Sequence, residues 1–367
     1  MARWSEKKAW DWYNSHRWIR GCNFIGSDCA NRIDQWQSYG REARMEVADR
    51  ELQLAEDIGF NSVRIIVDFE VWLQEPDSYM EVLEEYITLC DKHKQSVMIV
   101  LTTEAQLPRG DGEFIPKQLG EQKYALGYHQ GRFPLTEEQK KLKPYHFMER
   151  PDLAKKYIKM VKAIVKKYAD DDRVLCWNVY NEPGITIRER SIPILDALFA
   201  AVRSQKPKQP CTADIWRGLD DNDAVKTPEE LHAIELSDVI SFHSYKPYAN
   251  MVPQIEGLRQ FGRPLLCTEW LNRINHSNVE EIYPLFYLEN VACYCWGFVV
   301  GKTQTHEPWE TLWNDFYNPA KQVEFDFTKW QHDLFRPNLR PYDPREVELI
   351  KRYNKLADRR DDKKANS

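Results

Sequence analysis

The chain has 367 residues, of which 42% are hydrophobic and 29% are charged, a balance that excludes a disordered or fibrous protein. Its 51 Lys and Arg against 57 Asp and Glu give a net charge of −6, which argues against a nucleic-acid-binding surface. No apolar run reaches the roughly 18 residues of a membrane helix, and the N-terminus lacks the apolar core of a secretion signal. The eight cysteines form no CxxC pair, and most lie in apolar runs. We therefore expect a cytoplasmic protein with reduced cysteines, no membrane partner and no nucleic-acid partner.

Eight short β-rich runs recur along the chain, and most of them are almost continuously apolar. Such runs are typical of parallel strands that are covered on both faces. Helical patterns lie between them, and this alternation predicts an α/β fold, a (β/α)8 (TIM) barrel, with one domain over residues 1–357. The predicted strands are Gly21–Ile25, Ser62–Val67, Ser96–Leu101, Val174–Tyr180, Pro210–Asp214, Val239–His243, Pro264–Thr268 and Ala292–Phe298.

Two of the intervening helices have clear patterns. The first is predicted over Asp49–Ile58, with Gly59 as its stop signal. The second is predicted over Asp152–Tyr168, with an inward apolar face, outward lysines and Asp152 as its N-cap.

Two segments depart from this regular alternation. Residues 102–150 form a long gap without a clear strand, rich in Gly, Pro, Gln and aromatic residues. Loops of this length are usually functional, and after the third strand this one would overhang the carboxyl end of the barrel, where active sites lie. The highly charged segment 358–367 is predicted to fray into solvent.

Two glutamates end predicted strands on opposite sides of the barrel mouth. Glu182 follows the fourth strand, and Pro183 cannot continue that strand. Glu269 follows the seventh strand. A single Glu at a strand end is more often a surface residue, but a facing pair provides the two carboxylates that glycoside cleavage needs.

The aromatic content also favours a sugar ligand. The chain contains 13 Trp, 18 Tyr and 15 Phe, more than a core alone is expected to need. Several Trp residues lie beside polar residues, and flat rings with hydrogen-bonding neighbours suit the apolar face and hydroxyl rim of a sugar. The predicted sugar-contacting members of this set are Trp36, Trp270 and Trp309.

Asn181-Glu182-Pro183 after the fourth strand and Glu269 after the seventh resemble the clan A glycoside hydrolases, and in particular the family-five cellulase, mannanase and β-mannosidase type. The resemblance covers roughly residues 18–350. It implies that Glu182 is the acid/base and Glu269 the nucleophile. Like charges disfavour joint ionisation, so an ionised Glu269 nearby would help Glu182 to hold its proton.

Further positions match the same family one by one. Arg64 resembles the arginine that steadies the nucleophile, although a structural ion pair with Asp68 is the alternative. His243 and Tyr245 resemble the pair that lines the glycone subsite, and Trp296 resembles the platform beneath the sugar. Asn181 would donate a hydrogen bond to the sugar 2-hydroxyl.

One position departs from the family pattern. Many members carry a His at the end of the third strand, where this chain has Thr102-Thr103-Glu104. Either Glu104 or a residue of the segment 102–150 would then make that substrate contact. This difference puts the substrate preference in doubt more than the mechanism.

Other chemistries find no support in the sequence. There is no HExxH motif, and Cys293 and Cys295 have no partner ligands. Gly110-Asp111-Gly112 lacks the remainder of a nucleotide loop, and no GxSxG motif is present. We therefore predict no metal and no cofactor.

The prediction is a retaining β-glycosidase that acts on β-1,4-linked oligosaccharides, with exo-action on a terminal β-mannosyl residue. The alternatives are an endo-acting glucanase, mannanase or xylanase, a transglycosylase, and a sugar-binding barrel without catalysis. The sequence leaves open whether the chain forms a homo-oligomer.

Overall fold

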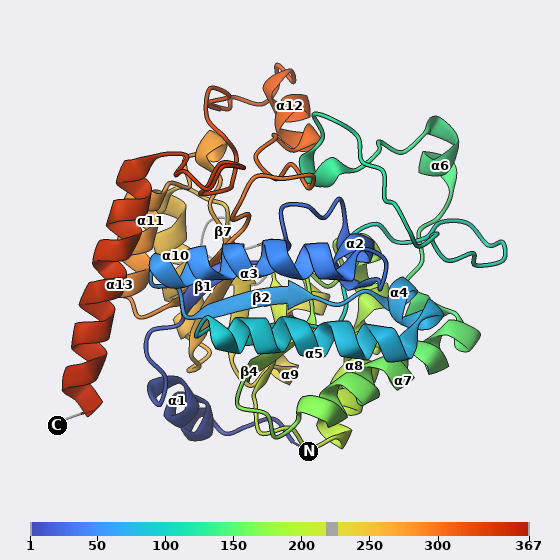
Figure 1. Cartoon of the computed structure of the whole chain (residues 1–367), viewed down its shortest axis with the longest axis horizontal. Coiled ribbons are helices and arrows are strands. Elements are labelled where there is room, and N and C mark those ends of the chain that lie inside the picture. The colour runs from blue at the N-terminus through green and yellow to red at the C-terminus, as the bar shows by residue number, and fades with distance from the viewer. Residues whose placement is uncertain (1, 218–226, 366–367) are drawn as a thin grey trace.

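The computed structural model is a ring of eight strands surrounded by helices (Figure 1). It describes residues 2–217 and 227–365. All neighbouring strands are parallel, and the last pairs with the first to close the barrel, which confirms the predicted (β/α)8 fold. The strands are β1 (Arg20–Asn23), β2 (Ser62–Ile66), β3 (Ser96–Val100), β4 (Val174–Tyr180), β5 (Cys211–Ile215), β6 (Ile240–His243), β7 (Leu265–Trp270) and β8 (Ala292–Cys295).

The helices form the outer layer (Figure 1). Since they cover the strands from outside and side chains fill the barrel from inside, nearly every strand residue is buried. The helices are α1 (Glu6–Asn14), α2 (Arg32–Trp36), α3 (Arg41–Asp57), α4 (Phe69–Gln74), α5 (Pro76–Lys92), α6 (Glu137–Lys141), α7 (Pro151–Tyr168), α8 (Ile192–Ser204), α9 (Pro228–Leu236), α10 (Tyr248–Arg259), α11 (Val279–Leu288), α12 (Glu310–Phe316) and α13 (Pro344–Ala365).

The two helices predicted in detail are present with different starts. α3 begins at Arg41, two turns before the predicted start, and ends before Gly59, whose φ of +85° suits a helix stop. In α7 the N-cap is Arg150, and Pro151 occupies the first helical turn. The prediction of Asp152 as the cap is therefore wrong, because Pro151 lacks an N–H and favours the first helical position.

The prediction of a frayed segment 358–367 is wrong for residues 358–365, which are helical; residues 366 and 367 lie outside the described part of the chain. Residues up to 365 continue α13, which lies against α11 (Figure 1). Asp358 forms an ion pair with the buried Arg20 at 2.8 Å, and Asp361 accepts a hydrogen bond from the Trp18 backbone N–H. Composition alone could not show these partners, because they lie at the other end of the chain, in β1 and just before it.

The segment 102–150 is irregular apart from α6 and two short 3₁₀ turns. Its base is closed by a hydrogen bond from the Gly110 N–H to the Lys143 carbonyl at 2.9 Å. Its tip contacts the loop after β8, where Gln304 accepts a hydrogen bond from the Gly127 N–H at 2.7 Å. The segment therefore lies against the β8 loop that carries α12 (Figure 1).

All eight cysteines are free and buried, as predicted. Among the helices described here, none has both the length and the apolar character to cross a membrane.

Candidate active site

Glu269 lies on β7 with both carboxylate oxygens engaged. Oε1 accepts a hydrogen bond from Arg64 Nη1 at 2.8 Å, and Oε2 accepts one from the Tyr245 hydroxyl at 2.6 Å. A register shift between β6 and β7 places Glu269 opposite His243. Burial raises the pKa of Glu269, while the positive charges of His243 and Arg64 oppose this rise. The side chain is thus held in one position by donors that stabilise its anion.

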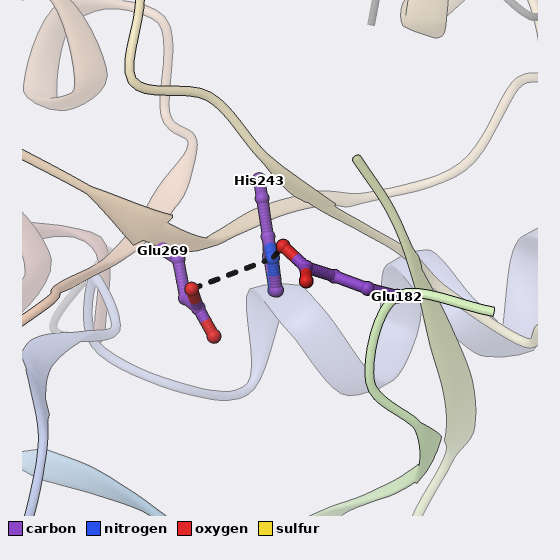
Figure 2. Close-up of side chains that lie close together, drawn as sticks. All are labelled: Glu182, His243 and Glu269. Atoms are coloured by element: carbon purple, nitrogen blue, oxygen red, sulfur yellow. Dashed lines mark hydrogen bonds and ion pairs between the residues drawn. The ribbon is translucent and has the colours of Figure 1, made fainter. Parts of the chain in front are cut away.

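Glu182 lies just after β4 and is more exposed than Glu269, at 19% of its side chain against 7%. Its φ of +51° is unusual for a residue with a side chain, and such backbone conformations cluster at functional sites. Its Oε1 lies 2.7 Å from His243 Nδ1. Figure 2 shows the His243 ring between the two carboxylates. One carboxylate oxygen of each glutamate and one ring nitrogen all lie within 4.8 Å of one another.

His243 is surrounded by acidic groups. Its Nδ1 lies 3.5 Å from Glu269 Oε2, a contact that Figure 2 marks, and its Nε2 lies 3.4 Å from Asp214 Oδ2. Burial lowers the pKa of His243, but the negative charges of Glu269 and Asp214 outweigh this effect and raise the pKa to about 10. The ring is therefore an imidazolium at neutral pH, and its Nδ1 donates to Glu182.

Arg64 on β2 joins side chains from the carboxyl ends of several other strands. Besides Glu269, its guanidinium donates to the side chains of Asn23, Asn181 and Asp214, at 2.6, 2.6 and 2.7 Å. The alternative ion pair with Asp68 is not formed, because Asp68 caps α4 instead. A lysine in place of Arg64 would lose several of these hydrogen bonds, because an ammonium group lacks the planar set of donors that a guanidinium has.

Asp214 on β5 is a site residue that the sequence did not reveal. It is fully buried and accepts hydrogen bonds from Arg64, Asn178 and Thr268, each at 2.7 Å. Burial raises the pKa of Asp214, but Arg64 and His243 outweigh it and keep the pKa well below its usual range. The available signal was an acidic residue at the end of a predicted strand, the same signal that identified Glu269.

Tyr245 connects Glu269 to the rim of the site. Its ring packs edge-on against Trp309 with centroids 4.8 Å apart. Trp309 Nε1 in turn donates to His129 Nε2 at 3.0 Å, and His129 belongs to the segment 102–150. The predicted Trp309 is thus part of the site's edge, next to Tyr245.

Three predicted substrate-contacting residues lie elsewhere. Trp36 is fully buried, donates to the Ile66 carbonyl and packs in the core. Trp270 points away from Glu269 and packs against Tyr283. The predictions that Trp36 and Trp270 contact the sugar are therefore wrong. Polar neighbours in the sequence do not show which way a ring points.

Glu104 is the third of these residues, and it is only 1% exposed. Its carboxylate holds the loop that follows Glu182, so it supports that loop and does not take the place of the missing His. Its donors are the Tyr180 hydroxyl and the backbone N–H groups of Gly184, Thr186 and Ile187.

A cavity extends from the site beneath the loops after β1, β2, β3 and β8. Arg64 and Trp296 line its inner end, so the predicted platform Trp296 faces open space. Lys117 and Gln130 of the segment 102–150 line the outer part. Asn181 is bound to Arg64 through its carbonyl oxygen, which leaves its amide nitrogen with one long contact, to Thr103 at 3.5 Å.

In the described part of the chain, Glu182, His243 and Glu269 are also the group whose atoms could hold a metal ion. The acidic neighbours raise the pKa of His243, so a proton competes with any cation at its Nδ1. The arrangement is instead suited to proton transfer at one carboxylate and nucleophilic attack by the other.

Replacing Asp214 by Asn is expected to lower kcat/KM by about tenfold or more and to move the alkaline limb of its pH profile to lower pH. Removing one negative charge lowers the pKa of His243, which therefore loses its proton earlier as the pH rises. Asp196→Asn is the matched control, since Asp196 pairs with His232 on the surface. An unchanged pH profile in Asp214→Asn would contradict this role.

Solved structures with similar folds are glycoside hydrolases. The family-five mannosidase from Rhizomucor miehei has a TM-score of 0.57 and 13% identity, with 94% of each chain covered. The exo-β-1,4-mannosidase from an Opitutaceae bacterium has a TM-score of 0.60 and 14% identity, over 94% of this chain and 60% of that one. The endo-β-1,4-mannanase from Thermotoga petrophila has a TM-score of 0.55 and 13% identity, over 94% and 78%.

No curated protein matches the chain in sequence. The family model of cellulase, glycosyl hydrolase family 5, matches residues 27–331, which is most of the chain. This range contains both glutamates, Arg64, His243 and Asp214. The chain therefore belongs to glycosyl hydrolase family 5 and is a glycoside hydrolase.

Proposed function

We propose that the protein is a retaining β-glycosidase that cleaves β-1,4-linked oligosaccharides by double displacement. The observation that carries this proposal is the approach of the Glu182 and Glu269 carboxylates to within 4.8 Å, on either side of His243. Retaining enzymes separate these groups by about 5 to 5.5 Å, whereas inverting enzymes need room for a water molecule between them.

In the first step a Glu269 oxygen forms a bond to the anomeric carbon while the bond from that carbon to the glycosidic oxygen breaks. Glu182 gives a proton to the departing oxygen. Arg64 and Tyr245 hold Glu269 for attack through the bonds described above. In the second step Glu182 takes a proton from water, and the resulting hydroxide breaks the glycosyl ester.

The imidazolium of His243 is suited to both steps. Its Nδ1–H···Oε1 bond to Glu182 places a proton on the line between the two groups. A shift of this proton to Glu182 makes it the acid, and its transfer to the departing oxygen leaves Glu182 ionised, as the base. The proton that Glu182 then takes from water restores the imidazolium. Once Glu269 is esterified its negative charge is gone, which favours the ionised form of its neighbour.

We further propose exo-action on a terminal β-mannosyl residue. The support is the position of the segment 102–150, whose tip is bonded to the loop after β8 and whose residues line the cavity. Such a wall favours a pocket for a chain end over an open groove. Several similar structures are described as mannosidases, although others are described as endo-mannanases.

Digestion of β-1,4-mannohexaose tests this proposal. Mannose released from the first minutes, with mannopentaose as the matching product, is the expected result. An early mixture of di-, tri- and tetrasaccharides would identify an endo enzyme. Products longer than the substrate would identify a transglycosylase.

Replacing residues 112–141 by a short Gly/Ser turn is expected to raise KM about tenfold or more, because Lys117 and Gln130 are then missing from the cavity. The Gly110–Lys143 hydrogen bond at the loop base allows this deletion without stretching the chain. The control replaces only the exposed helix α6, residues 137–141, and should keep the wild-type KM. Unchanged kinetics after the full replacement would rule out a role in substrate binding.

A further inference from the structure

We place the cavity on the glycone side of the reacting bond. Neither glutamate lines it, but its wall includes Trp296 and Arg64, whose guanidinium donates to Glu269. Because the leaving group departs beside the acid, the sugar that stays on Glu269 faces this cavity. Further along its wall lie two charged residues that the mechanism does not use, Arg32 and Asp68.

Arg32 is the first residue of α2, and its guanidinium has no hydrogen bond or ion pair with any residue in the described ranges. This contrasts with Arg64 in the same cavity, whose guanidinium has four partners. Burial lowers the pKa of Arg32 to about 10, against the opposing effect of Asp68 and Glu269. A partly buried cation without acceptors is unfavourable unless a ligand supplies them.

Asp68 offers the complementary group. Its Oδ1 caps α4 by accepting from the Val71 N–H at 3.0 Å, which leaves Oδ2 without a partner among the residues that the structure describes. The Asp68 carboxylate and the Arg32 guanidinium face the same cavity but do not approach within the 4.0 Å of an ion pair. Lys117 and Glu70, by contrast, are already paired at 3.1 Å.

We propose that Arg32 and Asp68 form a specificity subsite that binds two adjacent hydroxyl groups of a neutral terminal sugar, remote from its reacting carbon. One hydroxyl donates to Asp68 Oδ2, and its neighbour accepts from the Arg32 guanidinium. The Asp68 charge disfavours a sugar that carries a carboxylate. This subsite deepens the proposed exo-action and rests on it: the pair includes the 4-hydroxyl, which is free only on the terminal residue of a β-1,4-linked chain.

The test compares Arg32→Met and Asp68→Asn with the wild type on 4-nitrophenyl β-mannoside and on its 3-, 4- and 6-deoxy analogues. Asn keeps the cap of α4 through its amide oxygen, and it replaces the charged acceptor Oδ2 by an NH2 group that only donates. Arg352→Met, at an exposed position of α13, is the control for loss of one positive charge. We expect each subsite variant to lose about tenfold in kcat/KM on the parent sugar, mostly through KM.

The deoxy sugars identify the contact. On the analogue that lacks the hydroxyl bound by Arg32, the wild type should already show the loss, and Arg32→Met should add less than about twofold. Asp68→Asn should behave in the same way on the analogue that lacks the neighbouring hydroxyl. An equal loss on all analogues, or no loss on the parent, would overturn the subsite.

Two further results separate the subsite from the proposed function. A wild-type preference for the 4-nitrophenyl β-mannuronide that Arg32→Met abolishes would mean an anion site and would overturn the neutral-sugar proposal. If the wild type hydrolyses only β-glucosides or β-xylosides, the mannosidase proposal fails. The comparison of parent and deoxy sugars is then repeated with β-glucosides or β-xylosides, and its result supports or overturns the subsite.

Discussion

Glu269→Gln is expected to lower turnover of every substrate by about 10⁴-fold or more. The amide cannot form the glycosyl ester, because its oxygen is a poor nucleophile and its nitrogen holds no available lone pair. The change is nearly isosteric, so Arg64 keeps its bonds to Asp214 and Asn181 and the barrel should remain folded. Initial rates on an aryl glycoside with a good leaving group measure the effect without dependence on the acid.

The control for this experiment is Glu280→Gln, an exposed carboxylate in the first turn of α11. It should keep wild-type kinetics. Thermal unfolding of Glu269→Gln should show a cooperative transition, which separates lost chemistry from lost structure. Residual turnover above one hundredth of the wild type in a folded, contamination-free sample would show that Glu269 is not the nucleophile.

The strands were predictable because burial on both faces leaves a strong sequence signal. Each of the eight predicted runs overlaps an observed strand, and β4 is predicted to the residue. The ends of the strands were less predictable where a local backbone feature interrupts the pairing of neighbouring strands. β8 stops at Cys295, three residues before its predicted end, and Gly297 just beyond has a φ of +77°. The ends of α3 and α13 depended on contacts with distant parts of the chain.

Strand ends also explain which site residues could be found. Residues at the carboxyl ends of barrel strands converge whatever the loops do, so Glu182, Glu269, Arg64 and His243 come together as expected. No comparable rule predicts from the sequence which way a side chain points in a loop or turn. Trp36 lies next to polar residues in sequence and still points into the core.

The pairing of charged side chains in the site could not be predicted from the sequence. Asp214 serves Arg64 and His243 together, which no spacing of residues along the chain indicates. Arg32 shows the reverse case, since only the absence of partners in the described structure marks it as a ligand-facing cation. Both observations require the distances between side chains.

Glu182→Ala is expected to lose activity according to the leaving group. On natural oligosaccharides, where the departing oxygen needs a proton, kcat should fall by about 10³-fold or more. On a 2,4-dinitrophenyl glycoside the first step needs no acid, so the enzyme should form the glycosyl ester quickly and then stall. Stopped-flow measurement should show a burst of dinitrophenol followed by slow turnover.

Sodium azide should restore turnover of this variant on the activated substrate. The truncated side chain leaves space beside His243, whose positive charge attracts the anion and whose Nδ1 no longer has its partner. Azide needs no general base, so it attacks the ester on the face that Glu182 served. The product should then be the β-glycosyl azide, because two successive displacements restore the original configuration. An α-glycosyl azide, detected by the one-bond carbon–proton coupling at its anomeric centre, would mean a single displacement and would overturn the assignment of Glu269 as a covalent nucleophile.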